Sequence, residues 1–291
     1  MSAEALALGG ITLLAAIVNG ALGYGFSSIT VPLALLFLTN RVLNPALVPI
    51  EVVLNAYVLW VNRAALPGVQ RRVLPVIIGI VPGVLVGTLL VSRVHPGWLK
   101  FATFSALLPL ILLQAAGFRR PVRAERALGL TFGSGVGLLY SVTTISGPPL
   151  AVMLNNQGLA KQEFRAAMGI IRLAESSLTA VAYAYAGLYS AQSISLIPMI
   201  VPSLVIGVPL GAWIIRHIDA ETFRRVCMSF DAWVVGFGIS SLLRLLHLVD
   251  GYAAYSVMAA VIAIDAVLLY RFFSGHHRAR VDVARLVSIK G

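Results

Sequence analysis

The sequence predicts an all-α integral membrane protein whose chain is divided into two halves of similar plan. Of its 291 residues, 59% are hydrophobic and 11% are charged, whereas about a quarter of the residues in a soluble domain are charged. Apolar runs of about 18 residues or more, long enough for a membrane helix, recur along the chain. Two of these runs are interrupted in a matching way, which indicates a repeat.

Nine apolar segments are predicted. Glycine, proline and hydroxyl residues interrupt two of them, at 5–39 and 127–157. The continuous segments are 44–62, 73–91, 98–117, 163–188, 194–215, 223–246 and 252–273. The connections are short, so we expect one compact bundle without a soluble domain.

The two interruptions run from Gly20 to Pro32 and from Gly137 to Pro149. A break in a membrane helix is tolerated only inside protein or beside a polar cavity, because unpaired backbone groups are costly in lipid. A helix that restarts after a break offers free N–H groups and the positive end of its dipole, which suits an anion. We therefore expect a small oxyanion to bind between the two restarts. The simpler alternative is that glycine and proline only kink packed helices.

The basic residues indicate how the chain crosses the membrane. If both interrupted segments turn back, one face holds 17 of the Lys and Arg residues in the connections and the other holds 3; if both cross, the split is 13 to 7. Cytoplasmic loops carry the excess of Lys and Arg, so the re-entrant arrangement is favoured, with the N-terminus outside and the C-terminus in the cytoplasm. The N-terminal residues lack the basic region and cleavage site of a signal peptide.

A short repeat supports two related halves. The stretch Val81 to Gly87 (VPGVLVG) resembles Val201 to Gly207 (VPSLVIG), and both lie in the third element of their half. Each half would contain one re-entrant hairpin and three crossings, and an odd number of crossings inverts the second half. The prediction is two inverted-topology repeats with a site at mid-membrane. The first repeat covers 1–126, the second covers 127–250, and 251–291 forms an extra transmembrane helix with a basic cytoplasmic tail.

Two stretches carry a resemblance to a known family. They are Gly23 to Pro32 (GYGFSSITVP), and Ser146 to Leu150 (SGPPL) followed by Phe164-Arg165-Ala166. The sequence resembles the sulfite exporter TauE/SafE family of membrane permeases over roughly residues 10–272. The resemblance implies transport of sulfite, sulfoacetate or related organosulfonates, by export or by uptake, and of thiosulfate in a distant branch that uses cysteines. The single cysteine, Cys227, lies outside both breaks and does not suit thiosulfate.

Charged residues within the apolar segments are candidates for function. Arg172 lies seven residues beyond Arg165, about 10 Å deeper along a helix, and its guanidinium matches a sulfonate or carboxylate. The alternative is an ion pair with Glu175 on the same helix face; the two roles are compatible. Glu51 and Glu175 lie in the second elements of their halves, and a buried carboxylate can carry a proton. A carboxylate fixed by a neighbouring arginine or hydroxyl is an equally simple interpretation.

Two aspartates lie in the last two segments. Asp231 is a third candidate for coupling. Asp265 lies outside the repeat and is expected to be structural.

These observations predict a secondary transporter of a small sulfur-containing anion in the cytoplasmic (inner) membrane, with proton coupling as a further expectation. The candidate substrate-binding residues are Tyr24, Ser27, Ser28, Thr30, Thr143, Thr144, Ser146, Gly147 and Arg172. The expected partners are the anion and the lipid bilayer, with the protein a monomer or homodimer. A passive anion channel is the alternative, and a membrane-embedded enzyme with Ser146 as nucleophile is a remote one.

Several activities find no support in the sequence. It has no nucleotide-binding glycine loop and no metal-ligand spacing, so no cofactor, no metal and no enzymatic activity are expected. The net charge of +11 is interpreted as a topology signal and not as a sign of nucleic-acid binding.

Overall fold

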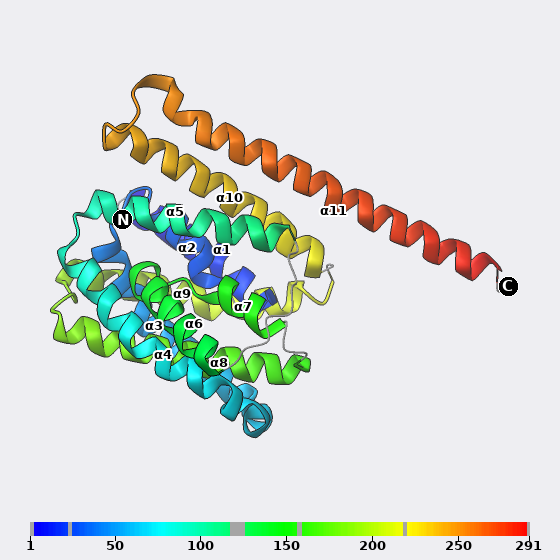
Figure 1. The fold of residues 1–291 in the computed structure, drawn as a ribbon, viewed down its shortest axis with the longest axis horizontal. Helices are drawn as coiled ribbons and strands as arrows, with labels where there is room; N and C mark the ends of the chain where they lie inside the picture. Colours follow the sequence, from blue (N-terminus) through cyan, green and yellow to red (C-terminus); the bar gives the residue numbers. More distant parts are fainter. Residues whose placement is uncertain (1–2, 23–24, 117–125, 156–158, 218–219, 290–291) are drawn as a thin grey trace.

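The computed structural model describes residues 3–22, 25–116, 126–155, 159–217 and 220–289. These residues are almost entirely helical and contain no β-strand (Figure 1). All helices except α11 lie together in one bundle, whereas α11 runs along its edge and extends well beyond it. The chain thus has the all-helical architecture that its composition predicts.

The first part of the chain forms five α-helices and one 3-10 helix. They are α1 (Ala3–Leu22), α2 (Phe26–Ala34), α3 (Asn40–Val61), η1 (Arg63–Ala65), α4 (Leu66–Arg93) and α5 (Pro96–Ala115). The second part forms α6 (Arg126–Thr143), α7 (Gly147–Asn155), α8 (Lys161–Tyr185), α9 (Ala191–Ile214) and α10 (Ala220–Leu245), and the chain ends with η2 (Gly251–Tyr255) and α11 (Ser256–Ile289). Both interrupted segments are broken into two helices where the sequence predicts, and α11 is longer than the predicted segment.

Among the described residues, six helical stretches are long and apolar enough to cross a membrane. They are Asn40–Val61, Arg63–Arg93, Pro96–Leu113, Ala191–Ile214, Arg225–Leu245 and Gly251–Ser274. Helix α8 does not belong to this set, because it contains several charged residues. Its Arg172 and Glu175 are buried inside the protein, and α8 packs on α3 and α4. The protein is therefore an integral membrane protein whose most polar long helix is shielded by its neighbours.

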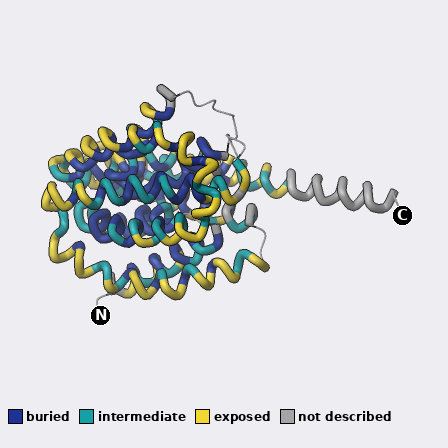
Figure 2. Tube along the Cα trace, turned by 90° about the horizontal axis from the view of Figure 1, so that it is seen from below, coloured by how far each residue is buried: buried dark blue, intermediate teal, exposed yellow. Residues whose placement is uncertain are grey.

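Helices of the two halves pack in matching pairs. Helix α4 packs against α6, and its matching pair is α1 against α9. Helix α4 also contacts α8, and its matching pair is α3 with α9. In addition, α3 packs on α8 and α5 packs on α10. The core lies between these pairs, and exposed residues cover the outside of the bundle (Figure 2).

Close helix crossings explain the glycines of the repeated stretches. A Cβ atom at Gly83 of α4 would lie 2.0 Å from the carbonyl oxygen of Ser134 in α6. A Cβ atom at Gly207 of α9 would lie 2.6 Å from the Cβ of Ala16 in α1. Small residues allow two helix backbones to approach closely within a membrane, so the glycines determine how tightly α4–α6 and α1–α9 can pack.

Both breaks have special backbone geometry. Gly25 precedes α2 with φ of 105°, a conformation that glycine adopts without strain. Thr144 follows α6 with φ of 55°, which is unusual for a β-branched residue. The Thr143 hydroxyl ends α6 by donating to the Leu139 carbonyl at 2.7 Å and accepting from the Ile145 N–H at 3.0 Å. The second break is therefore held by side-chain hydrogen bonds as well as by glycine.

Candidate functional site

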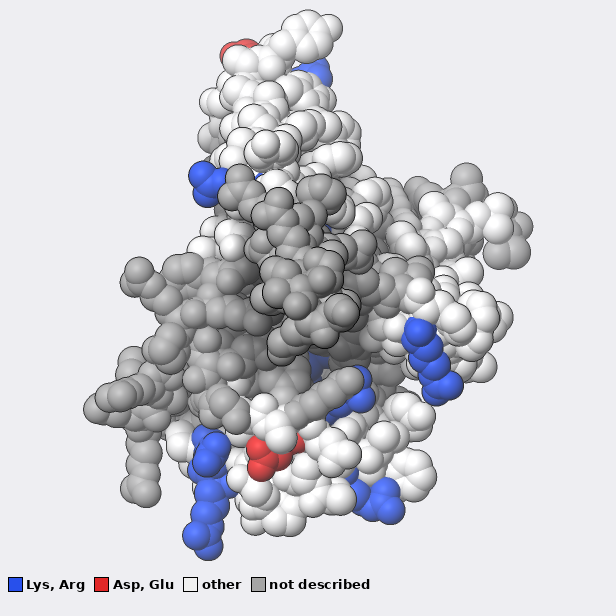
Figure 3. All heavy atoms as spheres, turned by 90° about the vertical axis from the view of Figure 1, so that its right-hand side faces the viewer, with Lys and Arg blue, Asp and Glu red and all other residues white. Residues whose placement is uncertain are grey.

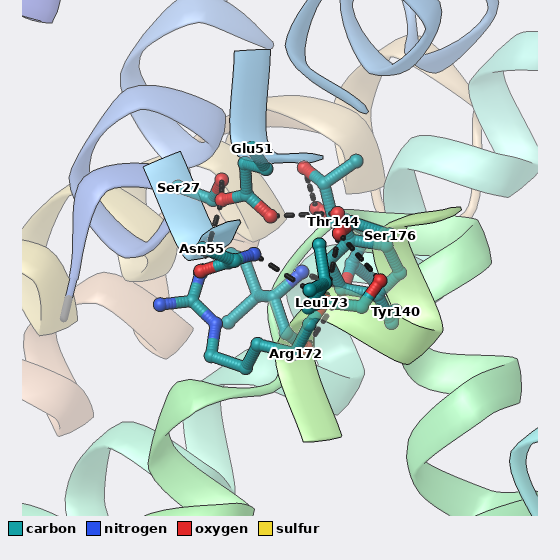
Figure 4. Close-up of polar contacts among 10 residues, drawn as sticks. Ser27, Glu51, Asn55, Tyr140, Thr144, Arg172, Leu173 and Ser176 are labelled. Atoms are coloured by element: carbon teal, nitrogen blue, oxygen red, sulfur yellow. Dashed lines mark hydrogen bonds and ion pairs between the residues drawn. The ribbon is translucent and has the colours of Figure 1, made fainter. Parts of the chain in front are cut away.

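Glu51 of α3 is the centre of a buried polar cluster (Figure 4). Its carboxylate accepts a hydrogen bond from the Ser27 hydroxyl in the first turn of α2. It also accepts from the Tyr140 hydroxyl of α6 at 2.7 Å and forms an ion pair with Arg172 Nη2 of α8 at 3.1 Å. Glu51 is completely buried, so its charge is balanced by these donors and not by water.

Arg172 is 5% exposed and is held on more than one side. Its backbone carbonyl accepts hydrogen bonds from Ser176 Oγ at 2.7 Å and from Asn55 Nδ2 at 3.4 Å. Its Nε has no hydrogen-bond partner among the described residues. Part of the guanidinium fork is therefore free to bind another acceptor.

The ion pair of Arg172 differs from the alternative that helix spacing suggested. Spacing along α8 favoured Glu175, three residues away, as the partner. The side chain of Arg172 instead reaches Glu51, which is 121 positions away in the sequence and lies on the facing helix α3. This pair joins the two halves of the chain.

Glu175 is also completely buried, and it lies near Ser146, Arg172 and Glu51. Neither of its carboxyl oxygens makes a hydrogen bond of ordinary geometry to the described residues, and the same is true of the Ser146 hydroxyl. One turn further along α8, the Thr179 hydroxyl is also buried and has no hydrogen-bond partner within the described ranges. Buried polar groups are seldom left unpaired, so this side of the cluster is suited to receive a polar ligand, water or a proton.

Glu51 and Glu175, which lie in the second elements of their halves, also begin a short matching pattern that was not among the predicted repeats. Residues 51–56 read EVVLNA and residues 175–180 read ESSLTA, so each Glu is followed by Leu, a polar residue and Ala at the same spacing. Near each Glu lies a serine next to a break, Ser27 for Glu51 and Ser146 for Glu175. The short match is detectable in the sequence once the two helices are aligned on their glutamates.

The other predicted residues of the first break have different positions. Ser27 belongs to the cluster, whereas Ser28 is half-buried. Thr30 is buried, and its hydroxyl has no hydrogen-bond partner in the part of the chain that the structure describes. Tyr24 lies outside the described residues. Tyr140, which the list of candidates omitted, contacts Glu51 directly.

The residues of the second break are mainly used to shape the backbone. Thr143 caps α6, as described above, and the Thr144 hydroxyl donates to the Thr143 carbonyl at 2.7 Å. Gly147 begins α7 and is followed by Pro148 and Pro149, which have no N–H to offer. At its restart α7 therefore offers fewer free backbone N–H groups than α2.

Asp231 lies apart from the cluster. It is buried in α10 with one carboxyl oxygen unpartnered, and it makes no hydrogen bond or ion pair with Glu51 or Arg172. Asp265 of α11 forms a buried ion pair with Arg225 Nη2 at 2.7 Å and accepts from Ser229 Oγ at 3.2 Å. The predicted structural role of Asp265 agrees with this contact. Arg225 is one of the 17 Lys and Arg residues counted above for one face of the membrane, but it is buried within α10.

One end of the cluster is closed by hydrogen bonds. Asn40 and Asn44 of α3 both donate to the Val142 carbonyl near the end of α6, at 3.1 and 2.6 Å. Tyr183 of α8 donates to the Ser141 carbonyl. All of these residues are buried, so protein separates Glu51 from the end of the bundle at which α3 begins.

Comparison with known proteins adds an independent result. The profile of the sulfite exporter TauE/SafE family matches residues 8–237. A curated relative, the probable sulfite/organosulfonate exporter TauE of Cupriavidus necator, is 29% identical over 197 residues, which cover 62% of this chain and 73% of the relative. No solved structure matches. The matched region contains the broken helices and the whole Glu51–Arg172 cluster, and the chain therefore belongs to the sulfite exporter TauE/SafE family of membrane transporters.

Proposed function

We propose that this protein is a secondary transporter that moves a small sulfur-containing anion, sulfite or an organosulfonate such as sulfoacetate, across the cytoplasmic membrane. The observation that carries the proposal is the buried Arg172, which among the described residues forms its ion pair with a carboxylate from the other half of the chain. The name of the family and that of the relative from Cupriavidus necator support the class of substrate.

In this proposal Glu51 occupies the place that a transported anion would take. A sulfonate or sulfite has several acceptor oxygens, as a carboxylate does, and could accept from Arg172 and from the Ser27 hydroxyl. The N-terminus of α2 adds backbone N–H groups and a favourable dipole on the same side. Binding would therefore exchange one anion for another at Arg172.

The exchange gives a reason for proton coupling. If the substrate displaces Glu51 from Arg172 while Glu175 is also ionised, three negative charges surround one cation, and this excess of buried negative charge is costly. A proton delivered to Glu51 or to Glu175 lowers that cost. Glu175 is the more direct acceptor because its oxygens have no other partner among the described residues. One proton would then cross with each anion.

The fold supports an inverted repeat around this site. If each helix is replaced by its counterpart in the other half, the α4–α6 pair becomes the α9–α1 pair. In the same way the α4–α8 pair becomes the α9–α3 pair. Helices α2 and α7 have nine residues each, about 13 Å of helix, which is too short to cross a hydrocarbon core of about 30 Å. We therefore propose that both are re-entrant, that residues 1–126 and 127–250 are the repeats, and that the N-terminus is outside and the C-terminus cytoplasmic.

The experiment is substrate flux into proteoliposomes that contain the purified protein. The proposal expects saturable uptake of sulfite or sulfoacetate that an imposed proton gradient accelerates. Arg172→Ala should reduce uptake to the level of empty liposomes while the protein remains folded. Uptake that does not saturate and ignores the proton gradient would instead favour the passive channel, and undiminished uptake by Arg172→Ala would contradict the role of Arg172.

A further inference from the structure

A cavity opens on the side of the cluster opposite to the closed end. It has a volume of about 370 Å³ and lies between α1, α3, α8 and α9. Its walls include Asn19 of α1, Leu54 of α3, Asn62 just after α3, and Arg165 and Met168 of α8. This cavity, called the vestibule below, reaches the end of the bundle where α3 ends and α8 begins.

The vestibule contains polar groups that nothing in the described protein satisfies. Asn19 is 3% exposed, and its Oδ1 has no hydrogen-bond partner. Arg165 is exposed and makes no ion pair with any residue in the described ranges. Its acidic neighbour Glu163 is used elsewhere, since it caps α8 by accepting from the Ala160 N–H at 3.0 Å.

The vestibule leads to the Glu51–Arg172 cluster. Leu54 and Met168 in its wall are each about one helical turn from the two charged residues of the cluster. Arg165 and Arg172 are seven residues apart, which places them on the same face of α8 and about 10 Å from each other along its axis. An anion that leaves Arg165 along α8 therefore meets Arg172 next.

The surroundings favour anions on this side. Arg63 and Arg216, at the ends of α3 and α9, are exposed like Arg165. In Figure 3, which shows the face at the right of Figure 1, Lys and Arg side chains lie at several places, and the acidic ones are few. Clefts lined by charge of one sign concentrate counter-ions.

We propose that the vestibule is a second anion-binding site, in which Arg165 and the Asn19 amide capture a small sulfonate or sulfite and hand it to Arg172. The identity of the anion rests on the proposed function; the anion selectivity of the vestibule does not. The side-chain amide of Asn19 can present either its oxygen or its NH₂ group, and an anion would select the NH₂ group. The site would raise the local substrate concentration at the cytoplasmic entrance.

The test measures the reaction of a cysteine in the vestibule with charged reagents. Cys227→Ser removes the native thiol, and Ala212→Cys, or Asn62→Cys as a second reporter, places a thiol in the vestibule wall. Each variant, in nanodiscs of phosphatidylcholine, reacts with 2-sulfonatoethyl methanethiosulfonate or with its cationic trimethylammonium analogue. The ratio of the two rates reports the local potential. The anionic reagent is itself a small organosulfonate.

The proposal predicts that Arg165→Gln lowers the ratio of anionic to cationic rates by about five-fold, as expected for a unit charge about 8 Å away in a largely aqueous cavity. Arg71→Gln, which removes an exposed arginine outside the vestibule, is the matched control and should leave the ratio unchanged. Sulfoacetate should slow the anionic reagent in the Arg165 protein and not in Arg165→Gln. An equal ratio in the two proteins would overturn the proposal.

Three further results separate this proposal from its rivals. If phosphatidylglycerol in the nanodisc blocks labelling while sulfoacetate does not, the vestibule binds a lipid headgroup and the proposal is wrong. If Arg172→Gln abolishes transport but preserves the charge-dependent labelling, the vestibule acts as proposed. If the wild-type protein transports no sulfur anion but labelling still depends on Arg165, the anion selectivity of the vestibule holds while the proposed function fails.

Discussion

Glu51 and Arg172 compensate each other's charge in the interior of the protein. Both are buried, and three helices supply the donors that surround the carboxylate of Glu51. An ion pair in such a position adds little stability compared with apolar residues, but removing one partner leaves a buried charge uncompensated. The pair is therefore better suited to switching between partners than to holding the helices together.

The first prediction concerns this mutual dependence. Glu51→Ala removes the ion-pair partner of the buried Arg172 guanidinium and should lower stability by about 3 kcal/mol or more. Combining Glu51→Ala with Arg172→Gln removes that charge and should recover a large part of the loss. The measurement is the Tm of the two single variants and the double variant in the same detergent, evaluated as a double-mutant cycle. Strictly additive shifts in Tm would show that the two residues do not interact.

The second prediction concerns Thr144. Its φ of 55° is in the left-handed region, which costs an L-residue about 1 kcal/mol or more. Thr144→Gly should therefore raise stability by about 1 kcal/mol and increase Tm, with substrate flux retained. Thr143→Gly is the matched control and should lower Tm, because the Thr143 hydroxyl caps α6. A lower Tm for Thr144→Gly would mean that the hydroxyl of Thr144 contributes more than its backbone costs.

Glycines lie where α4 meets α6 and where α9 meets α1, the closest contacts between the two halves that the glycine geometry shows. Gly79, Gly83 and Gly87 follow one another at four-residue spacing on α4, and each is close to α6. Gly207 and Gly211 do the same on α9 against α1. In lipid, where association is driven by packing and not by the hydrophobic effect, these contacts determine how the halves fit together.

The third prediction tests these contacts. Gly83→Ala would place a Cβ 2.0 Å from a backbone oxygen of α6, so α4 and α6 must move apart, at a cost of about 2 kcal/mol. Gly135→Ala is the matched control, since a Cβ there meets nothing within 4 Å and alanine favours helix by about 1 kcal/mol. Thermal unfolding should show a lower Tm for Gly83→Ala and an unchanged or higher Tm for Gly135→Ala. The reverse order would exclude a close α4–α6 crossing.

Over the whole molecule, the two halves share one polar centre. Ser27 and Glu51 come from the first half and Tyr140 and Arg172 from the second, so relative movement of the halves must change this centre. One end of it is closed by buried hydrogen bonds, and the vestibule opens at the other end. A transporter with alternating access is expected to be closed at one end and open at the other in any single state.

The fourth prediction concerns orientation in the membrane. With Cys227→Ser as background, Leu6→Cys and His95→Cys should be labelled by an impermeant thiol reagent from outside the cell. Gln70→Cys should be labelled only after the membrane is opened. Labelling of Leu6→Cys and His95→Cys from opposite sides would mean that the first broken segment crosses the membrane, and the inverted repeat would then be wrong.

The sequence predicted local features well and long-range contacts poorly. The segments and both breaks follow from apolar length and from glycine and proline, which act within a few residues. The partner of Arg172 was not predictable from spacing, because Glu51 is 121 positions away and only the packing of α3 on α8 brings the two together. Arg225 was misplaced for the same reason, since its partner Asp265 lies on another helix. Tyr140 was predicted to lie in the second break, but not to donate a hydrogen bond to Glu51.

The most direct measurement is equilibrium binding of sulfoacetate and sulfite to the purified protein, by calorimetry or thermal shift. Arg172→Gln is compared with Arg225→Gln, which breaks the other buried ion pair among the described residues. The account predicts that Arg172→Gln weakens binding at least ten-fold, whereas Arg225→Gln lowers Tm but binds the anion like the wild type. Equal binding by the wild type and Arg172→Gln would contradict an anion site at the junction of the two halves.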